Sequence, residues 1–376
     1  MKNKYFWKIV ASLFVILIMR PLVFKGQGCS DAGVCSVGSL SLVQFKYELL
    51  PSKENKLQLI IEEDTKLDTS SLGRSRNTND SLLRKFEYET SSPSKTDSIQ
   101  FKKTEFLIYS YKYPKYFFLI STTYGEGDNG TSIIVSQIEA NLRLKNEKTF
   151  AQIKLPYTFI SGKLGSINGL GDITISATHI MFSESKSSLS FSGGFKIPTN
   201  KSNRSLNNLP LPMVYQTSLG TTDILLGAKY TFKKWDGTIG YQHSFDANNN
   251  QYVHQSGVED PATYNSFFES KILRRADDAI FRINRNFIGK KINFSTGLLF
   301  IYHLKDDMYS DSKGKVVTAI GSKGLTLNIN LAGTIALSKK VDFVFIYANP
   351  IVTRKSRPDG LTRKYIFQIG FKYNIF

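Results

Sequence analysis

Histidine and serine are the residue types in this chain best suited to acid–base or nucleophilic chemistry, and their surroundings argue against catalysis. Of the four histidines, only His303, just before Asp306 and Asp307, stands where a general base would be expected. No serine lies in a Gly-x-Ser-x-Gly context that would supply a nucleophile. Phosphate-binding loops and clusters of metal ligands are also missing from the sequence. We therefore predict that the protein is not an enzyme and has no cofactor.

The two cysteines, Cys29 and Cys35, follow a segment with the features of an export signal. A basic start leads into an apolar run over residues 9 to 19, and small residues at 26 to 28 resemble a cleavage site. We predict a signal peptide over residues 1 to 28, with a retained anchor as the alternative. Because export permits oxidation, we expect a Cys29–Cys35 disulfide; the alternative is a lipid attached to Cys29. Metal binding by two cysteines without a neighbouring histidine is not expected.

A second group of residues could line a hydrated passage. Asp172 follows a Gly-Leu-Gly element and Asp223 follows Gly220, positions where the chain passes from a loop into a strand. We interpret these aspartates first as turn caps that shape the rim, with a polar constriction near the external mouth, paired with Lys196 or Lys229, as the functional alternative. The full set of predicted lumen residues is Asp172, Lys196, Asp223, Lys229, Gln242, Arg282, Asn328 and Asn330.

The elements that position these residues are amphipathic strands. From Tyr116 to Phe376, segments of roughly ten residues are joined by connections that alternate between short and long, as outer-membrane barrels require. We expect the short turns in the periplasm and the long loops outside. The predicted strands are 116 to 126, 131 to 144, 149 to 160, 170 to 182, 188 to 197, 220 to 232, 235 to 246, 279 to 287, 291 to 303, 324 to 337, 341 to 349 and 362 to 375.

Alternation within the strands indicates which face meets lipid. In the segment 324 to 337, leucines and isoleucines occupy one face, whereas Thr326, Asn328 and Asn330 occupy the other. Backbone groups in hydrocarbon must all be hydrogen-bonded, so strands in a membrane close into a barrel. The sequence therefore predicts an all-β protein, a transmembrane antiparallel β-barrel of about twelve strands.

The region before the barrel is less regular. Residues 29 to 115 form a predicted N-terminal extension that contains the cysteine pair and a polar segment rich in serine and lysine over residues 51 to 100. Alternating stretches at 43 to 49 and 101 to 113 could add two strands, so fourteen strands is the alternative count. The extension could otherwise enter the lumen as a plug. With an even number of strands, both ends of the barrel lie on the periplasmic side.

The net charge of +18 and the pI of about 9.6 would suggest nucleic acid as a partner of a cytosolic protein. Export removes most of that expectation, and the basic residues are spread over turns, loops and inward rows. We expect outer-membrane lipids as partners instead. The aromatic last residue, Phe376, suggests recognition by the outer-membrane assembly machinery, although it is out of phase with the outward row before it.

Several short elements give the chain a resemblance to a known family. They are Leu155-Pro156-Tyr157, Gly169-Leu170-Gly171-Asp172, Gly194-Phe195-Lys196-Ile197-Pro198-Thr199 and Gly220-Thr221-Thr222-Asp223 through Gly227. With them, residues 116 to 376 resemble the outer-membrane transporter-like barrels of the phenol-degradation MetA-pathway type, distant relatives of the long-chain fatty acid channels. Asn200 stands where that family usually has a glycine. The resemblance implies a β-barrel and uptake of small apolar molecules.

Two functions from different classes fit these patterns. The first is a channel or transporter in the outer membrane of a Gram-negative cell, which takes up small hydrophobic or anionic compounds by passive diffusion. The second is a non-conducting structural barrel that acts through its long external loops. Large inward side chains would fill the interior and small ones would leave a lumen, and the inward rows contain both.

Overall fold

The computed structural model describes residues 114–146, 148–184, 186–289, 291–361 and 363–376. The predicted signal peptide, the cysteine pair and all but the last two residues of the N-terminal extension lie outside these ranges. The two additional strands considered at 43 to 49 and 101 to 113 lie outside them too.

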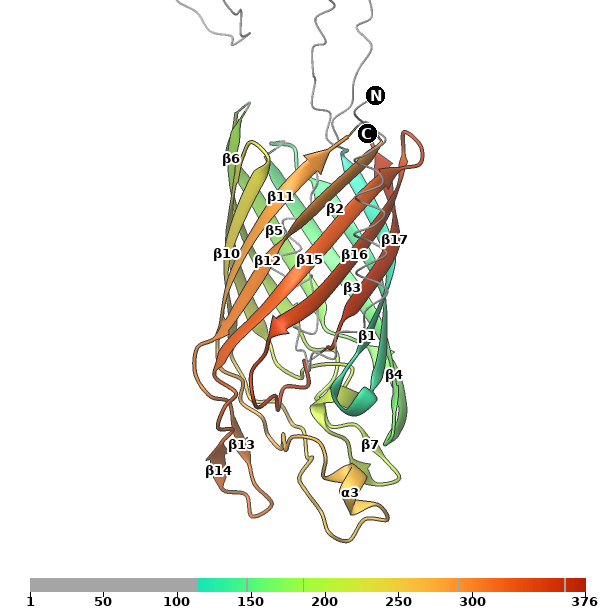
Figure 1. Cartoon of the computed structure of the whole chain (residues 1–376), viewed down its shortest axis with the longest axis vertical. Helices are drawn as coiled ribbons and strands as arrows, with labels where there is room; N and C mark the ends of the chain where they lie inside the picture. Colours follow the sequence, from blue (N-terminus) through green and yellow to red (C-terminus); the bar gives the residue numbers. More distant parts are fainter. Residues whose placement is uncertain (1–113, 147, 185, 290, 362) are drawn as a thin grey trace, which may run out of the picture. The chain divides into compact units, whose positions relative to one another are not determined.

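The described residues form a closed antiparallel β-barrel of twelve strands (Figure 1). Each barrel strand pairs with the barrel strand that follows it, and the pairing of the first with the last closes the ring. The barrel strands are β1 (Tyr116–Glu126), β2 (Ser132–Arg143), β3 (Thr149–Gly162), β5 (Ile173–Ser183), β6 (Ser187–Ile197), β9 (Asp223–Phe232), β10 (Trp235–Ser244), β11 (Asp278–Ile288), β12 (Ile292–His303), β15 (Gly324–Ala336), β16 (Val341–Val352) and β17 (Ile366–Ile375). This confirms the predicted barrel, with strand ends displaced by a few residues.

One strand of the barrel sheet was missed by the prediction. Residues 161 to 169 were expected to form a long loop, but β3 continues to Gly162 and β4 (Gly165–Leu170) runs back along it. Lys154 pairs with Thr174 and Tyr157 with Leu170, so the returning chain has one extra residue and forms a bulge around Gly171. Strands β4 and β5 thus form one bulged strand, whose first part extends the β3 hairpin.

The remaining elements are short and lie in the connections. They are η1 (Asp128–Gly130), β7 (Ser205–Leu206), β8 (Leu209–Pro210), η2 (Met213–Tyr215), α3 (Pro261–Tyr264), β13 (Met308–Ser310) and β14 (Val316–Thr318). None of the helices in the described ranges is long and apolar enough to cross a membrane.

Short and long connections separate to opposite ends of the barrel, which we call the turn end and the loop end (Figure 1). The alternation has one exception, because the β1–β2 connection at 127–131 is short yet lies at the loop end. There Asp128 accepts a hydrogen bond from Arg357 of the long β16–β17 connection, at 2.7 Å.

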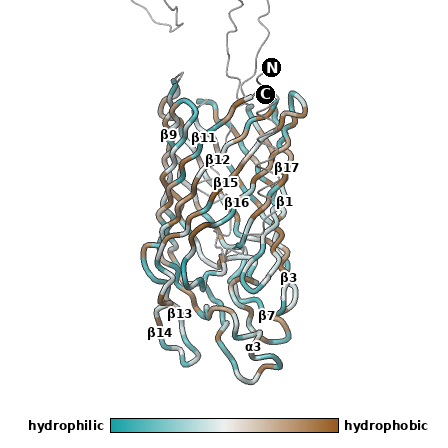
Figure 2. The backbone as a smooth tube through the Cα atoms, viewed as in Figure 1, coloured by the Kyte–Doolittle hydropathy of each residue, from teal (hydrophilic) through white to brown (hydrophobic). Residues whose placement is uncertain are grey.

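Hydrophilic and hydrophobic residues are interspersed along the barrel strands (Figure 2), and the two faces of the wall differ in chemistry. On β15, the outward Ile329 is 40% exposed, whereas the inward Asn328 is 2% exposed. On β5, Thr174, Ser176 and Thr178 are buried, and Ile175 between them is exposed. A continuous belt of exposed leucine, isoleucine and phenylalanine is stable only in an apolar environment, so the outer face fits a lipid bilayer.

Aromatic side chains mark both ends of this belt. Exposed aromatic residues near the loop end include Tyr124, Tyr157 and Tyr302, and those near the turn end include Tyr230, Phe232, Trp235 and Tyr373. Tyrosine and tryptophan prefer the boundary between hydrocarbon and headgroups, where the ring is in apolar surroundings and the polar tip is hydrated.

Lysine substitutions at two depths on one outward row test this belt. Ile329→Lys, far from both ends of β15, should lower the free energy of unfolding by about 2–4 kcal/mol, since a charge at mid-bilayer depth must be desolvated. Leu337→Lys, directly after β15 at the turn end, should cost only about 0–1 kcal/mol. Reversible urea unfolding of the full chain from lipid vesicles would measure both values. Equal costs, or a folded wild-type protein that needs no detergent or lipid, would contradict the membrane-facing assignment.

Candidate functional site at the loop end of the barrel

The predicted lumen residues all lie at inward positions of the wall, alternating with exposed outward ones. Seven of them are buried, and Lys229 is half-buried. Asp172, Lys196, Asp223 and Gln242 gather at the loop end, where their strands begin or finish. Lys229 and Arg282 lie farther along β9 and β11 toward the turn end, and Asn328 and Asn330 share the inward row of β15.

An ion pair and a hydrogen bond join the four residues at the loop end in pairs. Lys196 Nζ lies 3.7 Å from Asp172 Oδ2, which also accepts the backbone N–H of Leu219 at 3.0 Å. Gln242 Nε2 donates to Asp223 Oδ2 at 2.6 Å. The strand pairing places Lys196 directly beside Asp223. Both aspartates thus accept hydrogen bonds at the mouth, one of them from the β6–β9 connection.

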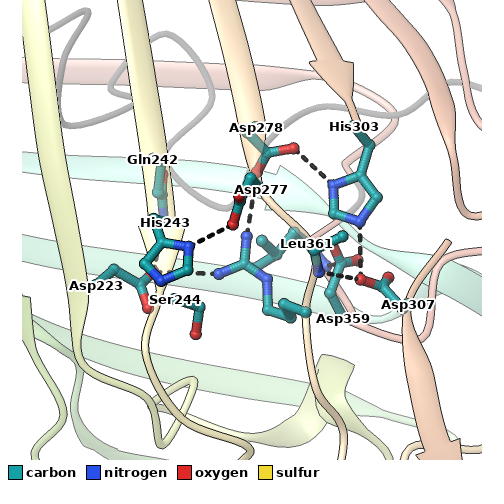
Figure 3. A network of polar contacts seen from close by, with 12 residues as sticks. Asp223, Gln242, His243, Ser244, Asp277, Asp278, His303, Asp307, Asp359 and Leu361 are labelled. Carbon is teal, nitrogen blue, oxygen red and sulfur yellow. Dashed lines mark hydrogen bonds and ion pairs between the residues drawn. The ribbon is translucent and has the colours of Figure 1, made fainter. Parts of the chain in front are cut away.

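A network of buried charges continues from Asp223 around the mouth (Figure 3). Arg275, just before β11, donates to Asp223 at 3.2 Å and to Asp278 at 3.3 Å. His303 lies between two carboxylates, with Nδ1 2.7 Å from Asp278 and Nε2 2.7 Å from Asp307. All five side chains are buried.

Arg354 extends the network to the last long connection. Its Nη2 donates to Asp359 at 2.7 Å, and its Nη1 lies 3.9 Å from Asp307 and donates to the Ser322 carbonyl at 3.0 Å. The ion pairs therefore tie the β10–β11, β12–β15 and β16–β17 connections to the ends of β9, β11 and β12. Sequence reasoning missed Arg275, Asp278, Arg354 and Asp359, because the network links segments that are far apart in the chain and no local pattern joins those segments.

Electrostatics keep these groups charged although they are buried. Burial disfavours the charged form of Arg275, but the attraction of Asp223 and Asp278 outweighs it and raises the arginine pKa above its ordinary value. The same balance, with Asp359 as the strongest partner, raises the pKa of Arg354. For Asp359, burial alone would raise the pKa, yet Arg354 and Arg275 hold it well below its usual range.

Part of the β6–β9 connection is buried at the mouth, where its Leu219 N–H donates to Asp172. Residues 211–219 are all buried, and they include η2 with Met213, Val214 and Tyr215. Gly360 packs against the backbone of Met213 and Val214 with φ at +64°, where a side chain would collide with that backbone. This segment therefore forms an apolar wedge at the mouth.

Polar contacts lock the wedge to the β10–β11 connection. Asn250 donates to the carbonyls of Ser202 and Leu211 at 2.8 and 3.0 Å, and Asn248 Nδ2 donates to Met213 Sδ at 3.2 Å. Two apolar clusters complete this cap: one contains Leu211, Val214, Tyr215, Tyr252, Tyr264 and Phe267, the other Met213, Leu219, Leu273 and Leu361. The loop end is thus a folded cap with a core of its own.

Deeper in the barrel, the wall carries polar groups that the protein leaves without hydrogen bonds. Both polar atoms of the Asn328 and Asn330 side chains are buried and have no protein partner, and Gln368 Oε1 has none either. An unpaired buried amide costs about 1–3 kcal/mol, so such groups are normally bonded to water. The inner face of β15 and β17 therefore carries buried amide groups that the protein itself does not satisfy.

His303, the one histidine considered as a general base, has no ring nitrogen available for that role. Both ring nitrogens of His303 are bonded to carboxylates, and the residue is 1% exposed. His243 lies on the outward face and is bonded to Asp277 at 2.6 Å. Among the described residues, no group of three or more histidine, cysteine, aspartate or glutamate side chains could hold a metal ion.

No family model and no curated protein matches this chain, so the resemblance to the MetA-pathway barrels remains a prediction. Solved structures share the fold. The COG4313 outer membrane channel from Pseudomonas putida F1 aligns with a TM-score of 0.50 and 12% identity, over 70% of this chain and 96% of that one. At that identity the likeness establishes the fold alone.

Two further barrels align more loosely. The KdgM porin aligns with a TM-score of 0.36 and 9% identity over 69% of this chain and 99% of that one. The CymD monoaromatic hydrocarbon channel aligns with a TM-score of 0.35 and 10% identity over 70% of this chain and 89% of that one. Scores this low carry no argument about function.

Removing Arg275 should open the cap while the barrel stays folded. Arg275→Gln leaves Asp223 and Asp278 buried without their cation, which should lower the free energy of local opening of residues 245–277 by about 3–5 kcal/mol. Hydrogen–deuterium exchange of the full chain in detergent would report this. Arg274 is exposed and directly precedes Arg275, so Arg274→Gln is the matched control. It should change the free energy of local opening by less than about 0.5 kcal/mol. Equal protection in both variants would show that the ion pairs do not hold the cap.

The cap should also weaken in acid through Asp359. Its pKa is lowered on folding, so its contribution is complete above the unfolded value of about 3.9 and is lost as the pH falls through the lower folded value. Asp359→Asn should therefore reduce the exchange protection of residues 353–361 at pH 7 and differ less from the wild type near pH 3. A difference between the two proteins that is constant with pH would contradict this assignment.

Proposed function

We propose that the protein is a channel of the Gram-negative outer membrane through which small compounds diffuse passively. The observation that carries this proposal is the inner wall, where Asn328 and Asn330 keep all their buried amide atoms without a protein partner. Such a wall is stable when water reaches it. The fold likeness to the COG4313 outer membrane channel supports the same function.

Small inward side chains leave room for a passage along one side of the barrel. Apart from Lys196 at the loop end, the inward residues of β6 are Ser188, Ser190, Ser192 and Gly194, all only partly buried. Gly227 of β9 pairs with Ser192 on one side and with Gly240 of β10 on the other. A lane of serine and glycine therefore crosses three neighbouring strands, whereas Leu299 and Ile301 on β12 are large and buried.

In the proposed orientation, the turn end and the C-terminus face the periplasm and the cap faces the outside. Short periplasmic turns and long external loops are the usual arrangement in outer-membrane barrels, which supports this orientation. A solute from outside would then meet the cap first. The recognition of Phe376 by the assembly machinery remains a prediction within this scheme.

The proposed solutes are small hydrophobic or anionic compounds. Met213, Leu219 and Leu361 give the cap an apolar core that suits the first class. Lys229 and Arg282 on the inward rows suit the second. Conductance in the presence of a small aromatic acid and of its uncharged analogue would separate the two classes.

The alternative function is a non-conducting barrel that acts through its loops. The one feature that favours it is the folded cap. Residues 211–219 and the charged ring occupy the mouth with few exposed atoms. A folded protein that stays silent in a planar bilayer would support this alternative and overturn the channel.

A substitution in the small-residue lane tests conduction directly. Wild-type protein should give discrete current steps in a planar bilayer, and Ser192→Trp should reduce their amplitude by roughly half or more, because an indole occupies the lane between Thr178 and Gly227. Phe191→Trp places the same side chain on the adjacent outward position and should leave the current unchanged. Equal currents from both variants would contradict a passage along β6.

A further inference from the structure

Four cations from three neighbouring parts of the wall meet at the turn end. Lys186 precedes β6, Lys233 and Lys234 form the β9–β10 turn, and Arg285 lies on β11. Lys233 N donates to the Lys186 carbonyl at 2.7 Å, and Asn286 N donates to the Lys234 carbonyl at 2.7 Å. We call these four residues, with the aromatic residues beside them, the basic patch.

Aromatic rings hold two of these cations at the edge of the apolar belt. Arg285 Cζ lies 5.4 Å from the centre of the Trp235 ring and 5.5 Å from that of Phe287, and Trp235 pairs directly with Arg285 across the sheet. Lys233 Nζ lies 5.1 Å from the Phe232 ring. Trp235 and Phe232 are 46% and 45% exposed on the outward face. Cation–π contacts of this kind fix the charged groups at the depth of the aromatic belt.

The cations of the basic patch are not neutralised by neighbouring carboxylates. Within the described part of the chain, none of the four forms an ion pair with an acidic side chain. Asp236 follows Trp235, but it faces inward, is buried and is bonded to Asn284 and Asn286. Glu184, in the β5–β6 turn, is the exposed acidic residue of this region. The patch therefore presents a clear excess of positive charge to the outside of the barrel.

We propose that the basic patch is a binding site for an anionic phospholipid of the adjacent leaflet. The planar guanidinium of Arg285 suits two phosphate oxygens, and Lys233 and Lys234 add charge beside it. The acyl chains would lie on the exposed outward row below the patch, which includes Tyr230, Ile239 and Ile283. This inference rests on the proposed membrane location and is independent of conduction.

The position of the patch favours a lipid over a soluble anion. Phe232 and Trp235 flank the cations on the same outward face that carries the apolar belt, so a ligand that is both charged and apolar fits the whole surface. Other turns also carry lysines, among them Lys148, Lys291 and Lys340. Only at the basic patch, among the described outward-facing residues, does an arginine lie over two rings.

The test is a lipid titration of the refolded full chain in detergent, followed by native mass spectrometry. Phosphatidylglycerol should bind more tightly than phosphatidylcholine with the same acyl chains. The triple variant Lys233→Gln, Lys234→Gln, Arg285→Gln should weaken phosphatidylglycerol binding by about 100-fold, on the basis of roughly fivefold for each cation. Unchanged binding in the triple variant, or equal binding of the two lipids by the wild type, would overturn the proposal.

Two controls keep the result interpretable. Lys313→Gln with Lys315→Gln removes exposed lysines beside β13 and β14 at the loop end and should leave lipid binding unchanged. Heat-modifiable migration of every variant would verify folding. Glycerol phosphate, which lacks acyl chains, should not displace the lipid, and displacement would show a general anion site instead. A silent planar bilayer would overturn the channel and leave this lipid measurement intact.

Discussion

The structure depends on the need to pair every backbone N–H and C=O group of a strand in apolar surroundings. Pairing of β1 with both β2 and β17 removes the free edges that an open sheet would expose. Once the sheet is closed, alternate residues must face in or out, and the outer row can be apolar only if the inner row carries the polar groups. The unpaired amides of Asn328 and Asn330 are a consequence of this division.

The loop end is subject to a different constraint, because the long polar connections there must be held in one arrangement. The buried ion pairs of Arg275 and Arg354 join three of the connections to one another or to the ends of β9 and β11. Burying charges is costly, so such a network contributes more to a unique arrangement than to net stability. The apolar wedge of residues 211–219 supplies the burial, and the charges around it determine where each connection lies.

The two ends of the barrel therefore differ in how their charges are used. At the loop end, aspartates and arginines are buried and paired with one another. At the turn end, Lys233 and Arg285 are exposed and supported by aromatic rings. Paired and buried charges fix the arrangement of the protein's own loops, whereas the exposed cations beside the apolar belt have no such internal partner among the described residues.

The sequence by itself determined the barrel, its strand positions and the direction of its side chains, because a period of two is a local property that each strand carries independently. It also identified Asp172, Lys196, Asp223 and Gln242 as inward residues, although their use as a passage is still a proposal. It missed β4, because the bulge at Gly171 interrupts the two-residue alternation by which strands were identified. The network around Arg275 was decided only by the tertiary structure. Its members come from separate connections, and no local pattern records which distant charges will share a buried site.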